Sequence, residues 1–212
     1  MDSIKTTIYK HIKMGTRPSG SRKSDRTDML NSGVISEIKN MIESFDINYK
    51  IKYEDTIECG ISGKKFKIDI GIYKDGALHT VILNKAFISS VQKNKYNNAN
   101  TSVGEIFRVL GKHADSNILF VTFIANVLPN YTKDGVLNGT SGYETSYIDL
   151  AKIPSTPLWQ EVCKRSYFAT ITYDIADVDY SSKDALHQTI ALSSVKNVNS
   201  TSFKNHIKKI FE

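Results

Sequence analysis

The spacing of hydrophobic residues changes several times along the chain, and each change predicts an element. Between Met29 and Phe45 apolar residues recur at steps of three and four, which predicts an amphipathic helix. From Ile47 to Cys59 and from Lys65 to Tyr73 apolar and polar residues alternate, which predicts two half-buried strands. Leu78 to Asn84 is more uniformly apolar, so we expect a third strand near the centre of the sheet.

The second and third strands should form a hairpin. Asp75-Gly76 lies between them, and this dipeptide readily supplies the positive φ angles of a tight reversal. The alternation in the second strand places Ile68, Ile70 and Ile72 on one side and Asp69 on the other. The three strands are therefore expected to be antiparallel.

The second half of the chain continues with alternating helices and strands. The pattern predicts two more strands and two helices: Asn97 to Leu110, Asn117 to Ala125, Tyr167 to Tyr173 and Ser200 to Phe211. The Gly-rich, aromatic segment from Val127 to Tyr147 is too long for a routine connection, so it is a candidate binding element. Together the elements predict an α/β fold with a central mixed sheet flanked by helices.

The length of 212 residues suits one domain with a sizeable core. We expect that domain to span residues 29–212 and residues 1–28 to form a flexible basic arm. The arm is expected because Gly15, Pro18 and Gly20 interrupt any periodic pattern. Its first 26 positions hold seven basic residues, Lys5, Lys10, Lys13, Arg17, Arg22, Lys23 and Arg26.

Composition narrows the function classes. Hydrophobic residues make up 40% and charged residues 24%, as in ordinary globular proteins. The longest apolar run, Ile118 to Ala125, is shorter than the ~20 residues of a membrane span, and no signal peptide is recognisable at the first residues. We therefore expect a cytoplasmic protein in which Cys59 and Cys163 are buried, unpaired thiols. The net charge of +6 suits a polyanionic partner.

The candidate chemistry lies around the predicted hairpin. Asp69 stands in Lys67-Ile68-Asp69-Ile70, and Lys85 ends Leu83-Asn84-Lys85. With these residues the stretch from Lys64 to Gly111, about a quarter of the chain, resembles the core of the PD-(D/E)xK nuclease superfamily, which includes many type II restriction endonucleases. The resemblance implies a core of helix, three antiparallel strands, helix and strand. It also implies that Asp69 holds Mg²⁺ and that Lys85 assists the attacking water.

The sequence departs from the family pattern at one position. Leu83 occupies the acidic position of the triplet and cannot bind a metal. Some superfamily members carry this carboxylate on a neighbouring helix, which makes Glu105 the first candidate and Glu37 the second. Each residue also has an ordinary interpretation: Asp69 as a solvated strand residue, Lys85 as a snorkelling lysine, and Glu105 as the helical partner of Arg108.

Polar and basic residues follow the lysine and are suited to contacts with phosphates and sugars. We expect nucleic-acid contacts from Ser89, Ser90, Lys93, Asn94, Lys95, Asn97 and Asn98, from Arg17, Arg22 and Lys23 of the basic arm, and from Tyr143 of the long segment.

The leading hypothesis is a Mg²⁺-dependent endodeoxyribonuclease, resembling a type II restriction enzyme, that acts on double-stranded DNA as a homodimer. One alternative is a DNA-binding module on the same fold that has lost catalysis. Another is an RNA-directed nuclease or a metal-free enzyme acting on bases. The sequence contains no P-loop and no His or Cys spacing typical of zinc sites, so we expect neither a nucleotide cofactor nor zinc.

Overall fold

A six-stranded mixed sheet forms the centre of the structure, a computed structural model that describes residues 2–16, 23–42, 48–60, 64–89, 91–142, 161 and 164–212. The first three strands in the sheet pair antiparallel, the next two join them in parallel, and the last is antiparallel. Their order across the sheet is β1 (Tyr49–Tyr53), β4 (Ile70–Lys74), β5 (Ala77–Phe87), β6 (Asn117–Ala125), β9 (Ser166–Ile175) and β10 (Val195–Asn199). The expected α/β class with a mixed sheet is confirmed.

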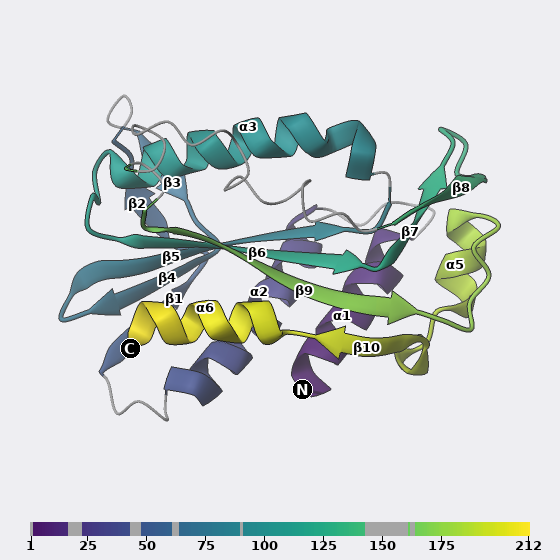
Figure 1. The fold of residues 1–212 in the computed structure, drawn as a ribbon, viewed down its shortest axis with the longest axis horizontal. Helices are drawn as coiled ribbons and strands as arrows, with labels where there is room; N and C mark the ends of the chain where they lie inside the picture. Colours follow the sequence, from purple (N-terminus) through teal and green to yellow (C-terminus); the bar gives the residue numbers. More distant parts are fainter. Residues whose placement is uncertain are drawn as a thin grey trace.

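Helices cover both faces of this sheet (Figure 1). One face is covered by α3 (Val91–Leu110). The opposite face is covered by α1 (Asp2–Gly15), α2 (Lys23–Ile42) and α6 (Thr201–Phe211). Two small hairpins, a short helix and a 3₁₀ turn complete the described elements: β2 (Thr56–Glu58) with β3 (Lys65–Lys67), β7 (Val127–Tyr131) with β8 (Leu137–Gly142), α5 (Lys183–Thr189) and η4 (Leu192–Ser194).

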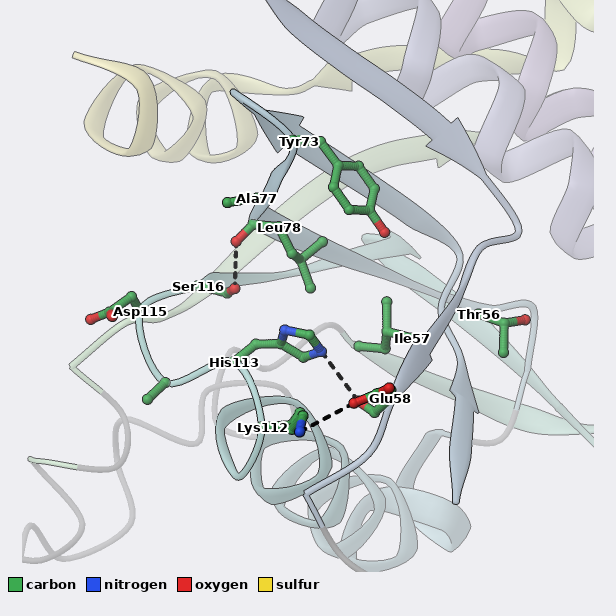
Figure 2. Close-up of a pocket in the computed structure, with 12 residues that line it drawn as sticks. Thr56, Ile57, Glu58, Tyr73, Ala77, Leu78, Lys112, His113, Asp115 and Ser116 are labelled. Carbon is green, nitrogen blue, oxygen red and sulfur yellow. Dashed lines mark hydrogen bonds and ion pairs between the residues drawn. The ribbon is translucent and has the colours of Figure 1, made fainter. Parts of the chain in front are cut away.

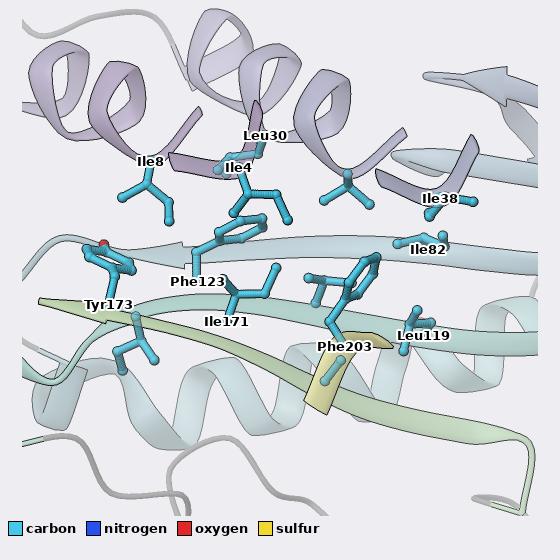
Figure 3. Packing of buried hydrophobic residues seen from close by; sticks show 14 of the residues in the cluster. Ile4, Ile8, Leu30, Ile38, Ile82, Leu119, Phe123, Ile171, Tyr173 and Phe203 are labelled. Atoms are coloured by element: carbon cyan, nitrogen blue, oxygen red, sulfur yellow. The ribbon is translucent and has the colours of Figure 1, made fainter. Parts of the chain in front are cut away.

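Each face of the sheet has its own hydrophobic core. In the larger core, Ile4, Leu30 and Ile38 of the helices meet Ile82 and Phe123 of the sheet (Figure 3). The smaller core lies under α3 and contains Val81, Leu83, Ile106, Val109, Ile118 and Phe120. Alternate residues of β5 therefore serve different cores, as the period of two in a strand requires.

The predicted flexible arm over residues 1–28 is wrong for the part that is described. Residues 2–15 form α1, and Lys23 begins α2. Ile4, Ile8 and Ile12 are at most 2% exposed, because their four-residue spacing gives one buried stripe. The basic residues of α1 stand between these isoleucines in the sequence, but on the helix they lie outside the buried stripe.

Two predicted strands are each broken in the structure. The stretch from Ile47 to Cys59 divides at Glu54, whose φ is 46°, into β1 and β2. The stretch from Lys65 to Tyr73 divides at Ile68 and Asp69 into β3 and β4. The break places Ile68 in the core under α3 and Ile70 in the opposite core, so the predicted common face of these isoleucines is wrong.

Other predictions from the pattern are close to the structure. The hairpin turn has φ angles of 51° at Asp75 and 83° at Gly76, as expected. β6 has the predicted bounds, whereas α3 begins at Val91 rather than near Asn97. The β7–β8 hairpin forms the described part of the long segment from Val127 to Tyr147. Residues 143–147 lie outside the residues that the structure describes.

Two further findings concern the class of protein. Within the described ranges, no helix combines the length and the apolar character needed to cross a membrane. Cys59 is a buried, unpaired thiol, as expected, and Cys163 lies outside the described residues.

Two helical glycines provide a test of the packing. A Cβ on Gly33 of α2 would lie 2.2 Å from Thr7 Oγ1 of α1, whereas a Cβ on Gly104 of α3 would meet nothing within 4 Å. We expect Gly33→Ala to lower the free energy of unfolding by about 1–3 kcal/mol through overpacking. Gly104→Ala should raise it by about 0.5–1 kcal/mol through helix propensity. Urea denaturation of both variants measures this, and an unchanged stability in Gly33→Ala would contradict the close approach of α1 and α2.

Candidate functional site

The candidate site lies where the pairing between β4 and β5 ends. The ladder runs from Lys74 and Ala77 to Ile70 and Ile82, while the ladder between β5 and β6 continues to Phe87. Beyond Ile82, the edge of β5 that faced β4 is therefore no longer paired with that strand. The backbone N–H of Asn84 donates instead to Asp69 Oδ2 at 2.7 Å. The carboxylate thus takes the position of a strand carbonyl.

Lys85 and Glu105 form an ion pair beside this carboxylate. Lys85 Nζ of β5 lies 2.8 Å from Glu105 Oε1 of α3, and the side chains are 29% and 12% exposed. The partner of Glu105 is therefore a residue of the sheet, not its helical neighbour Arg108. Leu83, two residues before Lys85 in β5, is 3% exposed and packs in the core under α3.

Asp69 lies within electrostatic reach of both residues. Burial raises the pKa of its carboxyl above the usual range. The hydrogen bond from Asn84 and the charge of Lys85 lower this pKa, and the charges of Glu105 and Glu54 raise it, so the net shift is upward. Asp69, Lys85 and Glu105 are therefore brought together by the break before β4, by β5 and by α3. The predicted hairpin had led us to expect this of Asp69 and Lys85.

Glu105 has one carboxylate oxygen without a partner. Its Oε2 is buried, and no hydrogen bond reaches it from the residues that the structure describes. A buried acceptor left unsatisfied costs about 1–3 kcal/mol, and more when the group is charged. The oxygen is suited to coordinate a cation or to accept a hydrogen bond from an ordered water.

Glu37, the second candidate carboxylate, lies in another environment. It is 6% exposed, and its Oε1 lies 3.0 Å from Lys204 Nζ of α6. This pair connects two helices that cover the sheet face opposite α3. The structure therefore places Glu105, and not Glu37, within electrostatic reach of Asp69. Among the described residues, no group of three or more His, Cys, Asp or Glu side chains could hold a metal ion.

The residues expected to contact nucleic acid are only partly described. Ser89 is half-buried just beyond β5, and Asn97 is exposed on α3, with its carbonyl oxygen accepting a hydrogen bond from Thr101 Oγ1 at 2.8 Å. Lys93, Asn94, Lys95 and Asn98 belong to α3 and Lys23 to α2, but their side chains fall outside the described part. Ser90, Arg17, Arg22 and Tyr143 are outside it altogether.

Two features beside the site were not predicted from the sequence. Asn84 Nδ2 donates to Asn31 Oδ1 of α2 at 2.6 Å, in the buried contact between helix and sheet. The signal for this pair was an asparagine within the apolar stripe of α2, three residues before Val34. Tyr53, at the end of β1, is 43% exposed, and burial and the nearby Asp28 carboxylate raise the pKa of its hydroxyl.

A cavity of about 500 Å³ lies elsewhere, where β2 and the β4–β5 turn meet the end of α3 (Figure 2). Glu58 makes two of the polar contacts that line the cavity. The Glu58 carboxylate lies 3.2 Å from Lys112 Nζ, and the Glu58 carbonyl oxygen lies 3.2 Å from His113 Nε2. Ser116 Oγ donates to the Leu78 carbonyl at 2.7 Å. These groups satisfy one another, and Asp69, Lys85 and Glu105 do not line the cavity.

Comparison with known proteins gives no relative. No family model, no curated protein and no solved structure matches the chain.

The raised pKa of Asp69 makes a prediction for stability. Because its folded pKa lies above the unfolded value, Asp69 stabilises the fold when protonated, and this contribution is lost as the pH rises through the folded pKa. Asp69→Asn should therefore raise the free energy of unfolding at pH 7 in EDTA. The gain should shrink below about pH 4, where wild-type Asp69 is protonated in both states. Urea denaturation at both pH values measures the difference.

Asp174 is the control with the opposite sign. Hydrogen bonds from Asn126 and Asn197 lower the pKa of its carboxyl, so its contribution is present at neutral pH and is lost as the pH falls. Asp174→Asn should lower stability at pH 7. A decrease of equal size in Asp69→Asn would contradict the description of Asp69 as a desolvated carboxylate.

Proposed function

We propose that the protein is a Mg²⁺-dependent endonuclease that hydrolyses DNA phosphodiesters with Asp69, Lys85 and Glu105. One observation carries the proposal: two carboxylates and a lysine, from the break before β4, from α3 and from β5, converge at the end of the β4–β5 ladder. Carboxylates that hold a divalent ion next to a lysine are suited to phosphoryl chemistry, because developing negative charge must be offset.

The order of elements supports the proposal. α2, the antiparallel β1, β4 and β5, then α3 and the parallel β6 follow one another along the chain. This is the succession of helix, three strands, helix and strand implied by the resemblance to PD-(D/E)xK nucleases. The small β2–β3 hairpin is an insertion between the first two of these strands. Function is argued from the site, since a fold by itself serves many activities.

The residues present fit a magnesium ion. Asp69 is a carboxylate whose burial disfavours its charge, and Glu105 has a buried oxygen without a described partner. A cation between them would compensate both. Mg²⁺ is usually held by one or two carboxylates, with water and substrate phosphate completing the shell, so two carboxylates suffice. Asp69 and Glu105 would hold the ion.

Each residue then has a defined role. The bound ion would lower the pKa of a water molecule and offset the charge of the scissile phosphate. Lys85 places its ammonium beside Glu105, where it orients the attacking water and stabilises negative charge developing on the phosphate. The Asn84 N–H holds Asp69 Oδ2, which fixes the direction of this carboxylate.

Duplex DNA is the proposed substrate. The net charge of +6 favours a polyanion, and double-stranded DNA follows from the family resemblance. Cleavage of a palindromic site would use a homodimer, because a two-fold protein matches a two-fold site.

One observation favours a second candidate, a DNA-binding module without catalysis. Leu83 is 3% exposed and fills the core under α3 at the position where the family places an acid. On this interpretation the Lys85–Glu105 pair is only structural. Such a module would bind DNA with steep salt dependence and cut no strand.

Incubation of the purified protein with long duplex DNA, in Mg²⁺ and in EDTA, separates these candidates. We expect Mg²⁺-dependent fragments. Asp69→Asn, Lys85→Ala and Glu105→Gln should each slow cleavage at least ~100-fold, because each removes several kcal/mol of charge stabilisation. Glu58→Gln removes an exposed carboxylate of the Lys112 ion pair and serves as the matched control with unchanged cleavage.

Four results would change the assignment. Cleavage in EDTA contradicts the metal mechanism, and intact DNA that is retarded in the gel favours the binding module. Loss of cleavage in Glu37→Gln but not in Glu105→Gln would assign the role of second metal ligand to Glu37 instead of Glu105. Cleavage of RNA but not of DNA would contradict the proposed substrate.

A further inference from the structure

The inference concerns the buried amide pair between α2 and β5. We propose that Asn31 and Asn84 are positioning residues, which anchor the end of β5 to α2 so that Asn84 and Lys85 hold the two carboxylates of the site. The positioning role rests on the proposed nuclease function, whereas the anchoring can be measured without it.

The pair is fully inside the protein. Asn31 is 0% exposed and Asn84 is 8% exposed, and their side chains are joined by the 2.6 Å hydrogen bond from Nδ2 of Asn84 to Oδ1 of Asn31. Asn31 Nδ2 and Asn84 Oδ1 are buried without a hydrogen-bond partner among the described residues. One bond therefore holds two amides that could each make several.

Such a pair is a poor source of stability. Each buried group left unsatisfied costs about 1–3 kcal/mol, and replacing both partners by apolar side chains of similar shape can be neutral or stabilising. Apolar residues already fill the surrounding contact: Leu30 and Val34 of α2 and Ile82 of β5 are at most 4% exposed. What the amide bond supplies, and apolar packing does not, is a fixed direction.

That direction is needed at Asn84 in particular. The ladder with β4 has ended at Ile82, so only β6 continues to pair with β5 at this level. Asn84 therefore has three separate contacts: its side chain with Asn31, its N–H with Asp69 Oδ2, and its strand pairing with Val121 of β6. Rotation of the strand about β6 would displace the N–H from Asp69.

The same anchoring reaches Lys85. Consecutive residues of a strand point to opposite faces, so fixing Asn84 towards α2 directs Lys85 towards α3 and Glu105. One strand that is paired on a single side thus fixes the position of Lys85 and, through the Asn84 N–H, the position of the Asp69 carboxylate.

The test uses the full chain with Asn31→Leu, which removes the acceptor at similar volume, and Asn31→Ala, which introduces no clash. Ser32→Ala is the matched control: Ser32 is the next residue of α2, is exposed, and bonds only the Met29 carbonyl among the contacts described. Amide hydrogen exchange by NMR is followed at Asn84 and, as a reference for global stability, at Val121. The Mg²⁺ concentration that gives half-maximal DNA cleavage is measured in parallel.

Loss of the anchor should accelerate exchange at Asn84 about tenfold more than at Val121 and raise the half-maximal Mg²⁺ concentration about tenfold, as loss of an outer support of a metal ligand does. Ser32→Ala should change neither. Equal acceleration at both amides, or none, overturns the anchoring. Selective acceleration with unchanged Mg²⁺ dependence overturns the positioning role. Selective acceleration in a protein that cuts no DNA supports the anchoring and contradicts the proposed function instead.

Discussion

The hydrogen bond from the Asn84 N–H to Asp69 is the contact on which the candidate site depends. A strand whose neighbour ends must satisfy its backbone groups in another way, and here a carboxylate does so at 2.7 Å. Because β4 begins only at Ile70, Asp69 leaves the alternation of its strand and turns its side chain towards β5. Lys85 and Glu105 then meet beside it, on the face covered by α3. If the β4–β5 ladder continued past Ile82, the Asn84 N–H would bond a β4 carbonyl instead of the Asp69 carboxylate.

Much of the fold follows from residue periodicity, because burial fixes which residues of each element face inward. α6 is predicted for this reason, whereas the hairpin is predicted from the Asp75-Gly76 turn and β6 from its nearly continuous apolar run. The break between Ile68 and Ile70 is not, because both sides of it are apolar and the alternation of the sequence continues through it. α1 is not predicted, for a different reason: its isoleucines, four residues apart, lie among lysines and are followed at once by Gly15, Pro18 and Gly20.

The site was predictable in its chemistry but not in its supports. Asp69 and Lys85 lie on the two strands of a predicted hairpin. Because Leu83 replaces the acid of the family pattern, the sequence also predicted that a carboxylate from a helix would complete the site. Whether Glu105 or Glu37 joins Asp69 depends on which sheet face each helix covers, and no local pattern contains that information. The site also opposes stability, since Asp69 is desolvated and Glu105 Oε2 lacks a described partner. Such conflicts between local rules and fold are expected at functional positions.

Binding of a divalent ion tests the central claim most directly, because it requires neither the DNA sequence nor the oligomeric state. Isothermal titration of the full chain with Mn²⁺, as a probe that Mg²⁺ displaces, should reveal a carboxylate site that is lost in both Asp69→Asn and Glu105→Gln and is kept in Glu58→Gln. Binding that is unchanged in both site variants, or no binding to the wild-type chain, would contradict the account of Asp69 and Glu105 as the ligands of one metal ion.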